Sequence, residues 1–352
     1  MGVTIEDIAR KLNVSASTVS RSLRQDPSIN SQTRARVYSM AMKMGYQGRS
    51  RRGVRKSDQK AAKIGVLLSA ESLEAAKESS ATLGYLHGIT AEADAARAMV
   101  TMHAVKAKDR GRMDQDPELV PLMVRERHCD AIITQGPQVA SDLALIGRRL
   151  PVISLGRTYP DLQTDAVLHD NIGGIRQLVG RLVKLGHRRL AWVHTGYEDL
   201  LYQARLAGFL EGCVSHGLNL EDQRLLRQGI FSSHPPFHLL EEGKARLLKE
   251  IKQGVTAFVC VNDREVAQPV VECLEQAGID VPGQVSVTGF DAHQHPTSGG
   301  KIITSIDPDF VEMGRLALRL AVQRAQQPWS RLVRIAPIGR FVEGDTIGPA
   351  PR

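Results

Sequence analysis

Apolar residues near the start of the chain recur at the spacing of short helices. A Thr4–Asp7 pair resembles a capping box, and the apolar residues after it predict a helix over about 5–12. A second short helix is expected after Ser15, which can cap it, and a third over about 32–44 would close a small core. Two helices separated by about three residues match a helix-turn-helix, a unit that places its second helix in the major groove of DNA.

From residue 63 onward, β-branched apolar runs alternate with helical stretches. The runs that predict strands are KIGVLLS (63–69), AMVTMHAV (98–105), DAIITQG (130–136), PVISLGR (151–157), AVLHD (166–170), RLAWVHT (189–195), LLRQGI (225–230), AFVCVND (257–263) and VSVTGFD (285–291). Strands that alternate with helices form parallel sheets covered on both faces. The first four runs are expected in one doubly wound lobe and the later runs in a second.

Positive charge is concentrated at the start of the chain. The formal net charge is +8, yet residues 1–60 hold 13 Lys and Arg against four acids, and the remainder is nearly neutral. Clustered cations are what binding to a polyanion requires, because they neutralise phosphates and release counterions. This pattern favours a nucleic-acid partner over the alternative, a basic tail that only keeps the protein in solution.

Several other classes of protein lack support in the sequence. The cysteines Cys129, Cys213, Cys260 and Cys273 are widely spaced, so we expect reduced core residues and neither a zinc site nor a disulfide framework. His293 and His295 are interpreted as part of a loop rather than as metal ligands. No phosphate-binding loop or catalytic constellation occurs, so no cofactor is expected. The chain starts without a signal peptide and has no apolar run of membrane length, which predicts a cytoplasmic protein.

The start of the chain resembles the DNA-binding headpiece of the lactose-repressor/galactose-repressor (LacI/GalR) family. The stretch VTIEDIARKLNVSASTVSRSLRQDPSINSQTRARVYSMAMKMGY follows the family pattern VT-x-x-D-[IV]-A-x-x-x-x-VS-x-x-TVSR-x-[LV] in register. The resemblance implies base contacts from Ala16, Ser17 and Arg21, and phosphate contacts from Thr18, Ser20, Arg24, Asn30 and Thr33. Short outward side chains on the second helix agree with this, because they let its backbone approach the groove floor.

Residues 47–62, QGRSRRGVRKSDQKAA, depart from the family, whose members have a proline and a hinge helix with a leucine that enters the minor groove. One interpretation is a flexible basic arm in which Arg51, Arg52 and Arg55 follow phosphates or lie in the minor groove. The other is a hinge helix that forms only on DNA, with Val54 as its wedge. Glycine costs about 1 kcal/mol per helix position and like charges repel, so the arm is favoured.

The rest of the chain resembles the effector-binding core of the same family, which is related to periplasmic sugar-binding proteins. The motifs that carry the resemblance are HDNIGG, LGHRRLAWV, RLAGF, VND, VTGFD and TSIDPDFVEMGRLAL. It implies that Arg205, Asn262 and Asp291 contact an effector in the cleft between the lobes. Arg205 would supply the N–H donors of its guanidinium, Asn262 an amide, and Asp291 two carboxylate acceptors. It also implies three crossings between lobes, one lobe comprising about 63–160 and 292–326 and the other about 161–291 and 327–352.

The predicted fold is an all-α helix-turn-helix headpiece (1–46), a basic linker (47–62) and a periplasmic-binding-protein-like α/β core (63–352) of two doubly wound parallel-sheet lobes. The predicted function is an effector-controlled transcriptional regulator, a repressor that binds a palindromic operator as a homodimer and responds to a small polar effector, a sugar or derivative. No heptads follow GRFVEGDT, so a tetramerising tail is not expected. Two alternatives stay open: a sugar-binding module, and an α/β enzyme with an appended DNA-binding domain.

Overall fold

A computed structural model of the 352-residue chain divides into two compact units, Met1–Ala61 and Ala62–Arg352, which are considered separately. The structure describes residues 4–23, 29–30, 33, 36–37, 40–41, 44, 61–70, 80–159, 161–197, 199–232, 237–293, 295–328 and 330–351.

The first unit contains the predicted pair of helices, α1 (Ile5–Leu12) and α2 (Ala16–Leu23). The Thr4 hydroxyl accepts from the backbone N–H of Asp7, and the Asp7 carboxylate accepts from that of Thr4, which confirms the capping box. Ser15 Oγ accepts from the N–H of Thr18 at 3.0 Å and so caps α2. The core between the helices comprises Ile8, Ala9, Val19, Val37 and Ala41.

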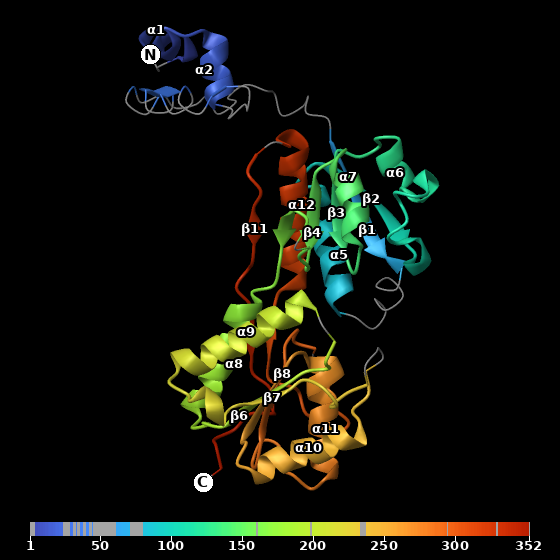
Figure 1. Ribbon diagram of the computed structural model, residues 1–352, viewed down its shortest axis with the longest axis vertical. Helices are drawn as coiled ribbons and strands as arrows, with labels where there is room; N and C mark the ends of the chain where they lie inside the picture. Colours follow the sequence, from blue (N-terminus) through green and yellow to red (C-terminus); the bar gives the residue numbers. More distant parts are fainter. Residues whose placement is uncertain are drawn as a thin grey trace. The chain divides into compact units, whose positions relative to one another are not determined.

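The first lobe of the second unit is built on a six-stranded parallel sheet (Figure 1). In the order β11-β5-β4-β3-β1-β2, its strands are β11 (Arg334–Ile335), β5 (Asp165–Val167), β4 (Val152–Leu155), β3 (Ala131–Gln135), β1 (Ala62–Ser69) and β2 (Ala98–Val105). Its helices are α5 (Ser80–Ala93), α6 (Leu122–Arg125), α7 (Ala140–Gly147) and α12 (Phe310–Gln326), with short 3₁₀ turns at Ala107–Asp109 and Pro117–Leu119.

Both faces of this sheet are buried along its central strands β1, β3 and β4, whereas the edge strand β2 is largely exposed. Alternate residues of β1, such as Ile64 and Val66, pack with α5 and α12, whereas Leu67 packs with α6 and α7. The helices α5 and α12 approach closely, since a β-carbon on Gly88 would lie 1.9 Å from the carbonyl oxygen of Val311. This two-sided burial explains why the strands read as continuous apolar runs.

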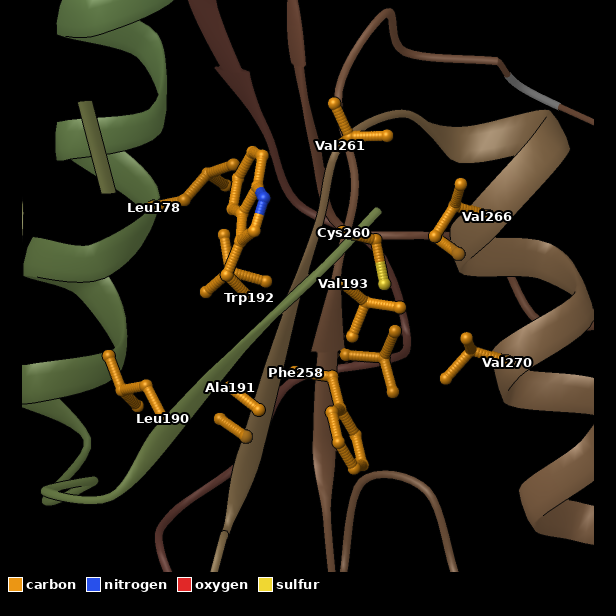
Figure 2. Close-up of a cluster of buried hydrophobic side chains, with 14 of the residues drawn as sticks. Leu178, Leu190, Ala191, Trp192, Val193, Phe258, Cys260, Val261, Val266 and Val270 are labelled. Carbon is orange, nitrogen blue, oxygen red and sulfur yellow. The ribbon is translucent and has the colours of Figure 1, made fainter. Parts of the chain in front are cut away.

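The second lobe has a four-stranded parallel sheet in the order β7-β6-β8-β9. Its elements are α8 (Asn171–Lys184), β6 (Leu190–Val193), α9 (Leu200–Ser215), a 3₁₀ turn at Leu220–Asp222, β7 (Arg224–Leu226), α10 (Glu241–Lys252), β8 (Ala257–Cys260), the π-helical turn η4 (Asp263–Ala267), α11 (Gln268–Gln276) and β9 (Ser286–Thr288). Figure 2 shows Trp192 and Phe258 of the central strands packed between Leu178 of α8 and Val270 of α11. Beyond the sheet, β10 (Ser305–Asp307) pairs antiparallel with β12 (Arg340–Val342).

The two sheets confirm the predicted fold class, but the predicted lobe boundaries need a correction. The run AVLHD was expected in the second lobe, yet β5 pairs with β4, and β11 pairs with β5 in the same first sheet. The reason is a buried ion pair: Asp165 of β5 accepts from Arg324 of α12 at 2.6 Å and from the N–H of Val333 at 2.8 Å. The chain therefore leaves the first lobe after β5 rather than near 160, and leaves it finally after β11 rather than near 326.

All four cysteines are free and buried, as the sequence predicted.

Candidate functional site

The outer face of α2 presents the side chains expected to read DNA. Ser17 and Arg21 are exposed, while Ala16 is half-buried and packs against the headpiece core. The Thr18 and Ser15 hydroxyls lie 2.8 Å apart. Arg21 is therefore the long, charged side chain that this helix offers to a groove.

The remaining predicted DNA contacts are only partly described. Asn30 Oδ1 accepts from the N–H of Thr33 at 2.7 Å, so this oxygen caps the next helical segment. Its amide nitrogen is the group suited to a phosphate. Predicted contacts that lie outside the described residues are Arg24, Arg51, Arg52, Val54 and Arg55.

The structure brings Arg205 and Asp291 together in the core unit. Arg205, on α9, is 1% exposed, and its Nη2 lies 2.7 Å from Asp291 Oδ1. Its Nη1 donates to the Val261 carbonyl at 2.7 Å, and its Nε donates to Asn171 Oδ1 at 2.9 Å. The guanidinium also lies 3.9 Å from the centre of the Phe290 ring, which adds a cation–π contact.

Asp291 reaches Arg205 because of an unusual backbone conformation at the end of β9. Its φ is +93°, and that of Ala292 is +47°, a left-handed region that costs energy for residues other than glycine. Two hydrogen bonds to β10 hold this turn: the backbone N–H of Asp291 donates to the Ile306 carbonyl at 2.9 Å, and the backbone N–H of Ala292 donates to Ser305 Oγ at 3.0 Å. With this backbone conformation, the Asp291 carboxylate lies beside Arg205.

Asn262 follows β8 but already has protein partners. Its Oδ1 accepts from the N–H of Glu265 at 3.2 Å as the cap of η4. Its Nδ2 donates to Tyr202 Oη at 3.2 Å and to Glu265 Oε2 at 2.9 Å. If Asn262 contacts an effector through its side chain, as predicted, some of these hydrogen bonds must therefore break.

Tyr202 and Glu265 were not among the predicted site residues, although two signals mark them. Tyr202 stands three residues before Arg205 on α9, and helical residues at that spacing share a face. Glu265 stands three residues after Asn262, which is the spacing of a capping box.

Beside this group, Asp263 fastens β8 to β10. Its carboxylate accepts from Ser305 Oγ at 2.8 and 2.9 Å and from the N–H of His293 at 2.7 Å. Burial, followed by the nearby Asp291 carboxylate, raises the pKa of Asp263 well above its usual range. This residue is therefore structural, and His293 donates to it through its backbone.

The first lobe contributes a buried tyrosine–histidine pair. Tyr85 Oη of α5 lies 2.5 Å from Nε2 of His169, which follows β5, and Phe310 packs edge-on against both rings. Burial, and then the positive charge of Arg205, lowers the pKa of His169 to about 4. A side chain at Gly156 would crowd this pair, because its β-carbon would lie 2.8 Å from Tyr85 Oη.

An ion pair links the two lobes at the same edge. Arg157, which follows β4, donates to Asp199 Oδ2 at 2.6 Å, and Asp199 Oδ1 caps α9 by accepting from the N–H of Leu201. Residues that follow β4 and β5 of the first sheet thus lie near Asp199, Arg205 and Asp291 of the second lobe, at the ends of strands where ligand sites in open α/β sheets occur.

The buried His169 predicts a specific pH dependence of stability. Its pKa of about 4 lies below the value of about 6.5 for the unfolded chain, so between these values only the unfolded state binds the proton. The free energy of unfolding should fall by about 2 kcal/mol from pH 7 to pH 5 on this account. Urea titrations at pH 7 and pH 5 measure this loss, which should be absent in His169→Gln. The exposed His128→Gln is the control and should keep the same loss as the unchanged protein. An equal change of the free energy of unfolding with pH in both variants would contradict the assignment.

Within the described segments, no three His, Cys, Asp or Glu side chains are grouped to hold a metal ion. None of the described helices is both long and apolar enough to span a membrane.

Comparison with known families identifies both units. Residues 4–48 match the family described as bacterial regulatory proteins, lacI family, and residues 179–347 match a periplasmic binding protein-like domain. The chain therefore carries a lacI-family DNA-binding domain followed by a periplasmic binding protein-like domain, and it is a DNA-binding transcriptional regulator.

Individual relatives agree with this identification. The arabinose metabolism transcriptional repressor of Geobacillus stearothermophilus is 29% identical over 60% of this chain and 59% of its own length. The transcriptional repressor CytR of Escherichia coli is 23% identical over 92% of this chain and 90% of its own. A solved LacI transcriptional regulator from a Rhodococcus species has a TM-score of 0.62 and 26% identity, covering 82% of this chain and all of that one. These relatives are regulators, which confirms the predicted non-enzymatic class.

Proposed function

We propose that this regulator is a repressor that binds a palindromic operator as a homodimer and is controlled by a small polar effector, a sugar or derivative, held between the lobes of its core. The observation that carries the effector proposal is the buried Arg205–Asp291 pair beside the tyrosine–histidine pair of the other lobe. A guanidinium and a carboxylate arranged in this way suit vicinal hydroxyl groups. A solved regulator CelR with cellobiose, at 21% identity and a TM-score of 0.62, supports the same class of effector.

For the DNA interface, we propose that Ala16, Ser17 and Arg21 read bases in the major groove. The proposed phosphate contacts are Thr18, Ser20, Arg24, Asn30 and Thr33. The exposure of Ser17 and Arg21 supports this assignment. The domain boundaries proposed are 1–46, 47–62 and 63–352, with 47–62 acting as a basic arm through Arg51, Arg52 and Arg55 rather than as a hinge helix with Val54. Binding to DNA implies a cytoplasmic protein.

Homodimerisation is supported by the edge strand β2. Among the described strands it pairs with β1 alone, and Met99 and Met102 on it are 60% and 42% exposed. Exposed apolar residues on a sheet edge are typical of an interface. A two-fold dimer matches a palindromic operator, with half-sites roughly 34 Å apart. A solved lac repressor dimer bound to operator, at 20% identity and a TM-score of 0.61, has the same fold.

The experiment is to measure operator affinity of the full-length protein with and without cellobiose, arabinose, ribose and glucose. One of these sugars or a close derivative is expected to change the affinity at least tenfold, within the range of about 1–3 kcal/mol usual for allosteric coupling. In Asp291→Asn this response should be lost, because the amide no longer matches the guanidinium and hydroxyl donors. The control is Asp307→Asn, whose carboxylate pairs with the exposed Arg340. A normal response in Asp291→Asn would refute the proposed site.

A further inference from the structure

Most hydrogen-bond donors on the second-lobe side of the site are already engaged. The Arg205 guanidinium donates four hydrogen bonds to protein acceptors, which leaves one N–H of Nη2 for a ligand. Both hydrogens of Asn262 Nδ2 are directed to protein oxygens, those of Tyr202 and Glu265. A ligand that needs several donors would have to break these bonds, and a lost bond to a buried charged group is costly.

Acceptors, in contrast, remain available on both sides. Glu265 Oε2 accepts from Tyr202 and Asn262, at 3.3 and 2.9 Å, while Oε1 of the same carboxylate receives no hydrogen bond from any described residue. In the first lobe, Gln135 Oε1 at the carboxyl end of β3 is buried without a partner in the described part of the chain. Gln135 is 7% exposed, so water cannot easily replace a missing partner there.

His169 adds a second unpartnered atom on the first-lobe side. It is 9% exposed, and Tyr85 contacts its Nε2 atom. Its other ring nitrogen, Nδ1, has no hydrogen-bond partner among the described residues. A hydroxyl both donates and accepts, so a polyhydroxyl ligand can satisfy this nitrogen as well as the free acceptors.

The balance of charge points in the same direction. The Arg205 guanidinium is matched by Asp291, and the Arg157 guanidinium is matched by Asp199. Glu265 lies 2.9 Å from an amide and 3.3 Å from a phenol, but no ion pair to it is formed within the described residues. A negative ligand entering here would meet an uncompensated carboxylate in a partly buried site, where repulsion is weakly screened.

We propose that Glu265, positioned by Tyr202 and Asn262, is a specificity-determining residue that selects an effector with hydrogen-bond donors and no negative charge, and that Glu265 Oε1 binds a hydroxyl or an ammonium group of that effector. Acidic sugars and sugar phosphates are excluded. This inference rests on the proposed function, because it assigns the class of effector for the same site.

The test uses the full-length protein and sets of sugars that differ in one charged substituent: glucose, glucosamine and glucuronate; ribose and ribose 5-phosphate. Affinities are measured by calorimetry, with operator binding as a second readout. The neutral or amino compound of a set should bind at least tenfold more tightly than its acidic counterpart. Glu265→Gln keeps the size of the side chain and its hydrogen bonds to Tyr202 and Asn262. It should reduce the ratio of the two affinities, that for the neutral or amino compound over that for the acidic one, by about tenfold. If Glu265→Gln lowers the affinity for glucosamine more than the affinity for glucose, the group bound by Glu265 Oε1 is an ammonium.

The matched control is Glu211→Gln, an exposed acid on α9 whose partner is Arg176, and it should change none of these ratios. Tyr202→Phe, which removes the phenolic donor to Glu265, provides a second variant if Glu265→Gln unfolds, and melting curves decide that point. Tighter binding of an acidic compound, or a charge ratio unchanged in both variants, overturns the inference and leaves the proposed function standing. If no compound binds and operator affinity never responds, the effector part of the proposed function fails, and this inference fails with it.

Discussion

Replacing Arg205 with alanine is expected to lower the free energy of unfolding of the core unit by about 3 kcal/mol. The substitution leaves the Val261 carbonyl and Asn171 Oδ1 without their donor, and it removes the charge that faces Asp291. Breaking a buried pair is costly because one charged group stays behind in a poorly solvated place. Asp291 is 25% exposed at its side chain, which keeps the loss near the lower end of the usual range. Urea denaturation followed by tryptophan fluorescence measures it, since Trp192 lies in the same lobe.

Arg176→Ala is the matched control for this prediction. Arg176 on α8 pairs with Glu211 at 2.8 Å, a distance close to that of the Arg205–Asp291 pair, but the two side chains are 50% and 47% exposed. Exposed pairs contribute about 0–1 kcal/mol, so its unfolding curve should shift little. Similar losses in both variants would show that burial is not what makes Arg205 important.

The sequence predicted the local elements of this protein well because the central strands of both sheets are buried on two faces. Each apolar run became a strand or the end of one, and the Thr4–Asp7 box marked the first helix. The sheet that a strand joins is harder to predict, because the apolar sequence of β5 would suit a strand of either sheet. Its place is decided by Asp165 and Arg324, two residues 159 positions apart whose pairing no local pattern reveals.

The candidate site was predictable to the extent that it follows the family motifs. Arg205, Asn262 and Asp291 do lie at the same edge, whereas their hydrogen-bond partners emerged only from the fold. Whether Asn262 is free or engaged depends on Tyr202, which lies 60 residues away in sequence. The pairing of Tyr85 with His169 spans 84 residues, and it depends on the absence of a side chain at Gly156. Long-range polar contacts of this kind leave no periodic trace in a sequence.

Arg21→Ala is expected to reduce discrimination between the operator and a scrambled duplex by about 5- to 150-fold. Arg21 is exposed on α2, and an arginine in the major groove pairs bidentately with guanine, which is worth about 1–3 kcal/mol of discrimination. A phosphate contact, in contrast, contributes equally on every sequence, so Arg24→Ala should weaken both duplexes alike and reduce the salt slope by about one unit. Binding to both duplexes at one salt concentration, repeated across a salt series, separates the two roles. Equal losses on operator and scrambled DNA in Arg21→Ala would show that this side chain contacts the backbone and does not read a base.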